Sequence, residues 1–224
     1  MGELSVVSLY VEVGRGQPAA VDRLRWLATL SYDDDVWVAY VAGACEADLA
    51  CWQGDLDRAR TLVQSTLARV ERTGEEKWLL LGIWPVALGL AVEADQAEQA
   101  RTGGDKSGLR EARILGADLL DRARAAVRRA PVLDRRVGPE ALAWLARVEA
   151  EWTRLEGHSD PEAWRTAVDA FSYGYVYEVA RCQRRLAEAL LGVGDREQAT
   201  PMARAALHTA ERLGADPLKV RCGD

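Results

Sequence analysis

The feature that most constrains the fold of this chain is an internal repeat. The pair Gly54-Asp55 recurs as Gly194-Asp195, and flanking alanines and leucines recur at the same offset of 140 residues. In both copies the Gly-Asp turn separates two apolar segments with the periodicity of helices. Helix pairs that return at a multiple of ~35 residues are typical of helical-repeat proteins. The sequence therefore predicts an all-α fold, a right-handed superhelical solenoid of antiparallel helix hairpins.

The helical pattern covers the whole chain, so we expect about ten helices in a single domain, residues 1–224. An atypical first hairpin covers residues 1–31, and later hairpins are expected at 36–73, 75–130, 139–173 and 175–213. Pro85 should kink or split the helix over residues 75–101, because proline lacks the amide donor that a helix interior needs. Residues 102–108 are predicted to form a loop.

Composition and charge exclude several classes of function. The formal net charge is −6, whereas a nucleic-acid-binding domain usually carries a basic stripe. No apolar run approaches the ~20 residues of a membrane span, so no membrane segment is expected. The four cysteines form no Cys-x-x-Cys pair and there are only two histidines, so no zinc site is predicted. We expect reduced thiols in a cytoplasmic protein.

The last hairpin resembles the tetratricopeptide repeat. Ala187 occupies the small position of its first helix, Gly194-Asp195 forms its turn, and Ala199 and Ala206 occupy the small positions of its second helix. Small side chains at these positions let the two helices approach closely. The resemblance implies an array of helix pairs that binds a partner and positions it.

Residues 160–218 carry a more specific resemblance. Four runs resemble the sensor region of large ATP-binding, MalT-like regulators of the LuxR family: Pro161–Phe171, Tyr177–Arg181, Leu186–Asp195 and Ala210–Leu218. In that family a nucleotide-binding domain precedes the helical repeats and a DNA-binding helix-turn-helix follows them. This sequence contains neither a Walker A segment nor a helix-turn-helix motif. The resemblance therefore implies a sensor or scaffold module that lacks both domains.

On this basis we expect a non-catalytic module of a bacterial transcription regulator. It would bind a peptide, a protein or a small-molecule effector, and the ATPase and DNA-binding domains of its parent regulator would act with it. The module itself would not bind DNA: arginines at positions 122–136 form the one basic concentration, and a solvated face is favoured there over a docking surface. A stand-alone adaptor that mediates protein–protein interaction is the alternative.

Charged residues on two predicted helices are the candidate binding residues. Arg147 and Glu151 are four apart, and Arg181, Arg184 and Glu188 are spaced by three and four on a later hairpin. By tetratricopeptide geometry they should face the inner groove, where paired arginines could hold a carboxylate. The simpler interpretation is a set of salt bridges between residues three or four apart.

No residue is predicted to be catalytic or to bind a metal or a cofactor. Residues 103–107 contain glycines and a lysine, but Asp105 stands where a phosphate-binding loop needs glycine. His158 and His208 lack a nucleophile at triad spacing, so an enzyme that uses a histidine in a helical cleft is the least favoured alternative. The eight tryptophans are interpreted as core residues rather than a ligand cage, because large side chains dominate interhelical packing.

Overall fold

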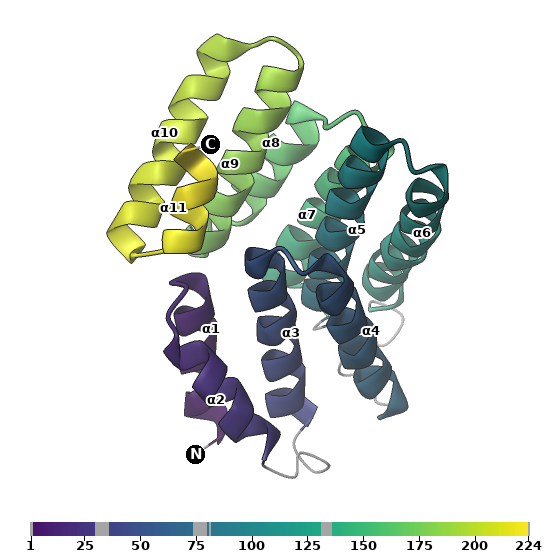
Figure 1. The fold of residues 1–224 in the computed structure, drawn as a ribbon, viewed down its shortest axis with the longest axis vertical. Helices are drawn as coiled ribbons and strands as arrows, with labels where there is room; N and C mark the ends of the chain where they lie inside the picture. The colour runs from purple at the N-terminus through teal and green to yellow at the C-terminus, as the bar shows by residue number, and fades with distance from the viewer. Residues whose placement is uncertain (1, 30–35, 74–79, 81, 131–135, 224) are drawn as a thin grey trace.

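The computed structural model describes residues 2–29, 36–73, 80, 82–130 and 136–223. Over these residues the protein is all-helical, with eleven helices and no strand, which confirms the predicted class (Figure 1). The helices are α1 (Gly2–Gly14), α2 (Ala19–Ala28), α3 (Val36–Gln53), α4 (Leu56–Arg72), α5 (Ile83–Gly103), α6 (Lys106–Arg129), α7 (Pro139–Glu156), α8 (Pro161–Ala170), α9 (Val176–Gly192), α10 (Arg196–Leu213) and α11 (Asp216–Gly223). Among them we find none with the length and apolar character that crossing a bilayer requires.

Three helix pairs are joined by turns that contain the same Gly-Asp pair. Gly54, Gly104 and Gly194 have φ angles of 77°, 70° and 83°, a region open to glycine because it has no Cβ. The aspartate after each glycine caps the next helix by accepting a hydrogen bond from a first-turn backbone amide. The expected loop over residues 102–108 is therefore wrong: only Gly104 and Asp105 separate α5 from α6.

The start of α5 differs from the helix predicted over residues 75–101. Residues 75–79 lie outside the described residues, and α5 begins at Ile83. Pro85 lies in its first turn, where the backbone amides have no partner within the helix. The proline therefore fits the beginning of α5 and does not kink a longer helix.

Helix α11 has no counterpart in the sequence prediction, in which the last hairpin ends at residue 213. Gly214, with a φ angle of 65°, ends α10, and the chain then turns into this short helix. Ala215 and Leu218 are fully buried against Ala180 of α9 and Ala210 of α10. A helix of this length is not stable alone in water, so tertiary burial of Leu218 stabilises it.

Helices that are neighbours in the chain pack against each other, and the two ends of the chain also meet. In Figure 1 the yellow helix α11 lies beside α9 and above the purple helix α1, with which it is in contact. The Arg15 side chain donates a hydrogen bond to the backbone oxygen of Leu213, at 3.0 Å. Arg221 of α11 donates to the backbone oxygen of Cys51 on α3, at 2.8 Å. These contacts close the helices into a ring.

The core consists of two main clusters of buried side chains. The larger one runs from α3 to α10 and includes Leu90 and Leu155. The smaller one joins α1, α2 and α3 through residues such as Leu9 and Leu27. Trp84 of α5 packs against both clusters, so it lies at the junction between them. The candidate site lies at this junction.

Candidate functional site

The structure brings together the five charged residues that the sequence singles out, on α7 and α9. Arg147 and Glu151 are almost completely buried, with exposed fractions of 3% and 1%. The side chains of Arg181 and Arg184 each retain 12% of their exposure, and Glu188 is exposed. Four of the five candidates are therefore nearly withdrawn from solvent, and their charges require partners inside the protein.

The partners of Arg147 and Arg181 come from other helices. Arg147 of α7 pairs with Glu178 of α9, whose side chain is fully buried. Arg181 of α9 donates two hydrogen bonds to the carboxylate of Asp48 on α3, at 3.0 and 2.9 Å. Bidentate arginine–carboxylate pairs are the strongest of the charged hydrogen bonds. These two pairs hold α3, α7 and α9 together across the middle of the molecule.

The salt bridges expected within each helix are also present. Arg184 pairs with Glu188, and Arg147 lies 3.9 Å from Glu151. Burial by itself would raise the pKa of Glu151, but the positive charge of Arg154 and other arginines outweighs it and lowers the pKa. Glu151 is therefore charged at neutral pH although it is buried.

Asp95 of α5 connects these pairs to a further helix. Its carboxylate lies 2.6 Å from Arg154 and 3.0 Å from Arg185. Burial would raise the pKa of Asp95, but the two guanidinium groups lower it to about 2. The carboxylate is therefore charged at neutral pH, and it ties α5 to both α7 and α9.

Ion pairs occupy the space between α3, α5, α7 and α9, where the sequence analysis expects residues that contact a ligand. We call the charged network the following ten residues: Asp48, Asp95, Arg147, Glu151, Arg154, Glu178, Arg181, Arg184, Arg185 and Glu188. The cavity among them has a volume of about 30 Å³, which holds about one water molecule. This cavity is too small for an organic ligand.

The sequence analysis missed the carboxylates that complete this network. Asp48 lies within the apolar helix α3, and Asp95 lies near the middle of α5. An acidic residue among the apolar residues of a helix often has a buried cationic partner, because an unpaired buried charge is very costly. This signal could have indicated buried ion pairs, although it does not identify which arginine each carboxylate contacts.

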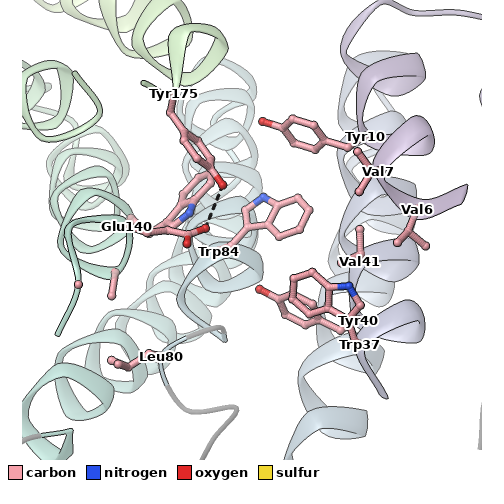
Figure 2. Close-up of a pocket in the computed structure, with 13 residues that line it drawn as sticks. Val6, Val7, Tyr10, Trp37, Tyr40, Val41, Leu80, Trp84, Glu140 and Tyr175 are labelled. Atoms are coloured by element: carbon pink, nitrogen blue, oxygen red, sulfur yellow. Dashed lines mark hydrogen bonds between the residues drawn. The ribbon is translucent and has the colours of Figure 1, made fainter. Parts of the chain in front are cut away.

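A second cavity, of about 380 Å³, lies between α1 and α3 on one side and α5 and α7 on the other (Figure 2). We call it the aromatic cavity because six aromatic side chains line it: Tyr10, Trp37, Tyr40, Trp84, Trp144 and Tyr175. Aliphatic side chains, including Val7 and Val41, complete its wall. Its volume is within the range of natural small-molecule sites. Three of the eight tryptophans thus line a cavity as well as packing in the core.

Trp84 is at the centre of the aromatic side chains. The rings of Tyr10 and Tyr40 each lie 5.8 Å from it and stand nearly at right angles to it, at 79° and 78°. Trp144 stacks on Trp84 with the ring centres 6.1 Å apart. Offset-stacked and edge-to-face contacts are the favoured geometries of aromatic pairs, so the rings stabilise each other's positions. The wall is largely formed before any ligand enters.

Glu140, at the start of α7, is the one charged residue among the described residues that line the aromatic cavity. Its carboxylate accepts a hydrogen bond from the hydroxyl of Tyr175, at 3.0 Å. Figure 2 shows this carboxylate directed toward the open space between Tyr175 and Trp84. Burial and the negative charge of Glu140 raise the pKa of Tyr175. Tyr175 therefore remains a neutral donor that orients the carboxylate.

Tyr10 connects the aromatic cavity to the charged network. Its ring lines the cavity, and its hydroxyl donates a hydrogen bond to Glu178 at 3.2 Å. Burial raises the pKa of Tyr10 well above its ordinary value, and the charge of Glu178 raises it further. A displacement of the Tyr10 ring would therefore alter a hydrogen bond in the network.

The remaining nucleophilic and metal-binding side chains do not form a site in the described part of the chain. No group of histidine, cysteine, aspartate and glutamate there could hold a metal ion. His158 and His208 are both exposed. Burial raises the pKa of Cys51 and of Cys182 to about 12, so both remain protonated at neutral pH. Cys45 and Cys222 are also free, and burial raises their pKa values too.

Comparisons with protein-family models, with curated proteins and with solved structures found no match to this chain.

Proposed function

We propose that this chain is a non-catalytic sensor module that binds a small organic molecule in the aromatic cavity. The observation that carries the proposal is the cavity itself, about 380 Å³ of space with six aromatic side chains on its wall. The cavity opens to solvent beside Val7, and its wall is mostly apolar and aromatic with few polar groups, as in natural small-molecule sites. In this proposal the charged network holds the helices in place and does not contact the ligand.

The proposal retains the fold type and family that the sequence suggests. The repeated Gly-Asp turn joins α3–α4, α5–α6 and α9–α10, which supports a tetratricopeptide-like solenoid of helix hairpins. The runs that resemble LuxR-family sensor regions, residues 160–218, coincide with α8 to α11. We therefore assign the chain to the sensor region of a LuxR-type regulator, with nucleotide and DNA binding left to other domains.

A ligand in the aromatic cavity could alter the whole arrangement of helices. The cavity separates α1 and α3 from α5 and α7, and Tyr10 links its wall to Glu178 of α9. A ligand shifts an equilibrium only if it binds one arrangement more tightly than the other. A preference of a few kcal/mol is enough to change the populations greatly. Binding of the ligand would thus change the contacts between the first and last helices.

Tryptophan fluorescence can test the proposal. Trp37, Trp84 and Trp144 line the cavity, so a bound molecule should change their emission and raise the melting temperature. Val7 lines the cavity and is 62% exposed, so Val7→Trp should fill the mouth without disturbing the core. Ligands found by screening should bind Val7→Trp at least ~10-fold more weakly, a loss of about 1.4 kcal/mol.

Val220→Trp is the matched control, because Val220 of α11 is 64% exposed and does not line the cavity. It should bind every ligand as the wild-type protein does. Equal binding by wild type and Val7→Trp would place the ligand elsewhere and contradict the proposal. Failure of a broad small-molecule library to bind at all would favour the adaptor alternative.

A further inference from the structure

We propose that the ligand of the aromatic cavity is an organic cation, held by the aromatic rings and by the carboxylate of Glu140. This inference rests on the proposed function, and it names the chemical class of the ligand. Three observations carry it: the sign of the charge at the cavity, the composition of its wall and the position of the Glu140 carboxylate.

The charge at the cavity favours a positive ligand. Of the described residues that line it, only Glu140 carries a charge, and no arginine or lysine is among them. Glu140 is exposed at the edge of the cavity, and its carboxylate attracts a cation and repels an anion. Among the described lining residues an anionic ligand would find no positively charged partner.

The aromatic wall suits a cation for a separate reason. The faces of tryptophan and tyrosine rings are electron-rich and attract a cation within about 6 Å, with tryptophan the strongest. The protein already uses this interaction next to the cavity, where the guanidinium of Arg147 lies 5.5 Å from the Trp144 ring centre. Trp37 and Tyr10 also line the cavity, so their rings can contribute to the attraction of a cation.

Glu140 is held so that its charge faces the ligand. The Tyr175 hydroxyl donates to Oε1, and Figure 2 shows both groups beside Trp84 at the edge of the open space. A carboxylate that accepts one hydrogen bond from the wall keeps free lone pairs for a positively charged partner. A cation in this cavity would therefore contact aromatic rings on several sides and a carboxylate on one.

Three probes with the same bicyclic body separate charge from shape: 1-methylquinolinium is a cation, 1-methylnaphthalene is neutral and 1-naphthoate is an anion. Titration calorimetry with the full chain should show that the cation binds at least ~10-fold more tightly than the neutral probe, and that the anion binds least. Glu140→Gln keeps an oxygen acceptor for Tyr175 but removes the charge. This substitution should weaken binding of the cation ~10-fold and leave the affinity for the neutral probe unchanged.

Glu197→Gln is the matched control, since Glu197 is an exposed residue of α10 that does not line the cavity. It should change none of the three affinities. If the neutral probe binds as tightly as the cation, or if Glu140→Gln weakens both equally, the cation inference is overturned while the small-molecule site stands. If none of the probes binds and screening also finds no ligand, both the cation inference and the proposed function are overturned.

Discussion

At the scale of single residues, the arginines of the charged network differ in how well they are partnered. Arg154 contacts three carboxylates: Glu151 at 2.8 Å, Asp95 at 2.6 Å and Glu98 at 3.1 Å. Arg184 has only Glu188, and its Nε atom is buried without a hydrogen-bond partner among the described residues. Burial, together with the positive charge of Arg185, lowers the pKa of Arg184. The fold therefore stabilises the positive charge of Arg154 and destabilises that of Arg184.

We therefore predict opposite outcomes for the same substitution at the two sites. Arg154→Met leaves Asp95 with only Arg185, at 3.0 Å, and Glu151 with only Arg147, at 3.9 Å, and should lower the free energy of unfolding by ~3 kcal/mol. Arg184→Met removes a poorly satisfied charge and should leave stability unchanged or raise it. Urea denaturation of both variants at pH 7 measures the change in the free energy of unfolding. Equal losses would contradict the assignment of partners.

The pKa of Asp95 predicts an acid-sensitive contribution to stability. Its folded pKa of about 2 is below the unfolded value of 3.8, so the charged form is stabilised in the fold. This contribution is complete above about pH 4 and is lost as the pH falls toward 2. It amounts to roughly 2 kcal/mol. Between pH 4.5 and 2.5, the free energy of unfolding of Asp95→Asn should fall less than that of the wild type. If the two curves of free energy of unfolding against pH are parallel, Asp95 is not the titrating group.

At the scale of helices, glycine determines how closely some of them approach. A Cβ atom on Gly116 of α6 would lie 2.5 Å from Leu155 of α7 and 3.0 Å from Leu90 of α5. Both distances are shorter than ordinary van der Waals contacts. The missing side chain lets α6 sit against both neighbours, and an alanine would force the leucines to move.

Gly116→Ala should therefore destabilise the protein by ~1–2 kcal/mol, although alanine is the better helix former. Gly192, the last residue of α9, has no atom within 4 Å of the same Cβ position. Gly192→Ala should be neutral or stabilise the protein by up to ~1 kcal/mol. Thermal unfolding of the two variants tests this difference. If Gly116→Ala is more stable than the wild type, α6 has space for the added methyl group and the assigned packing is wrong.

At the scale of the whole molecule, long-range polar contacts close the helices into a ring. Asp48 of α3 and Arg181 of α9 are 133 positions apart and form a bidentate pair. The Arg181 guanidinium also lies 5.1 Å from the ring centre of Trp52, and Arg221 of α11 lies 4.8 Å from the same ring. The N-terminal helices are thus joined to the C-terminal helices near the charged network.

A double-mutant cycle on Asp48→Asn and Arg181→Gln should reveal a coupling free energy of ~1–3 kcal/mol. Arg181→Gln leaves Asp48 without its cationic partner, and Asp48→Asn leaves Arg181 with Glu178 alone, at 3.5 Å. The losses of stability in the two single variants should therefore sum to more than the loss in the double variant. Urea denaturation of the four proteins gives the coupling. Additive effects would mean that α3 and α9 do not form this contact in solution.

Much of the helical architecture follows from local sequence. The Gly-Asp turns, the aspartate caps and the apolar periodicity are properties of short segments, and they predict most helices within a few residues. The third Gly-Asp turn, at Gly104, was interpreted as a longer loop because two glycines precede Asp105. Helix α11 was missed because burial of Leu218, rather than its eight-residue segment, stabilises it.

The candidate site could be predicted only in part. Helical spacing alone predicts that Arg181, Arg184 and Glu188 lie on one helix, and it also predicts salt bridges among them. It could not show that Asp48 would reach Arg181 from a helix more than a hundred residues away. The same limit applies to the aromatic cavity, whose side chains come from α1, α3, α5 and α7 and from Tyr175 just before α9.

The sequence by itself determined that this protein is helical, where two of its hairpins turn and which helix faces are apolar, because these depend on residues within a few positions of each other. Only the tertiary structure decided that ion pairs join α3, α5, α7 and α9 and that Trp84 and its neighbours line a cavity with one carboxylate. Both features depend on how separate helices approach, and that distance is set by packing between side chains far apart in the chain.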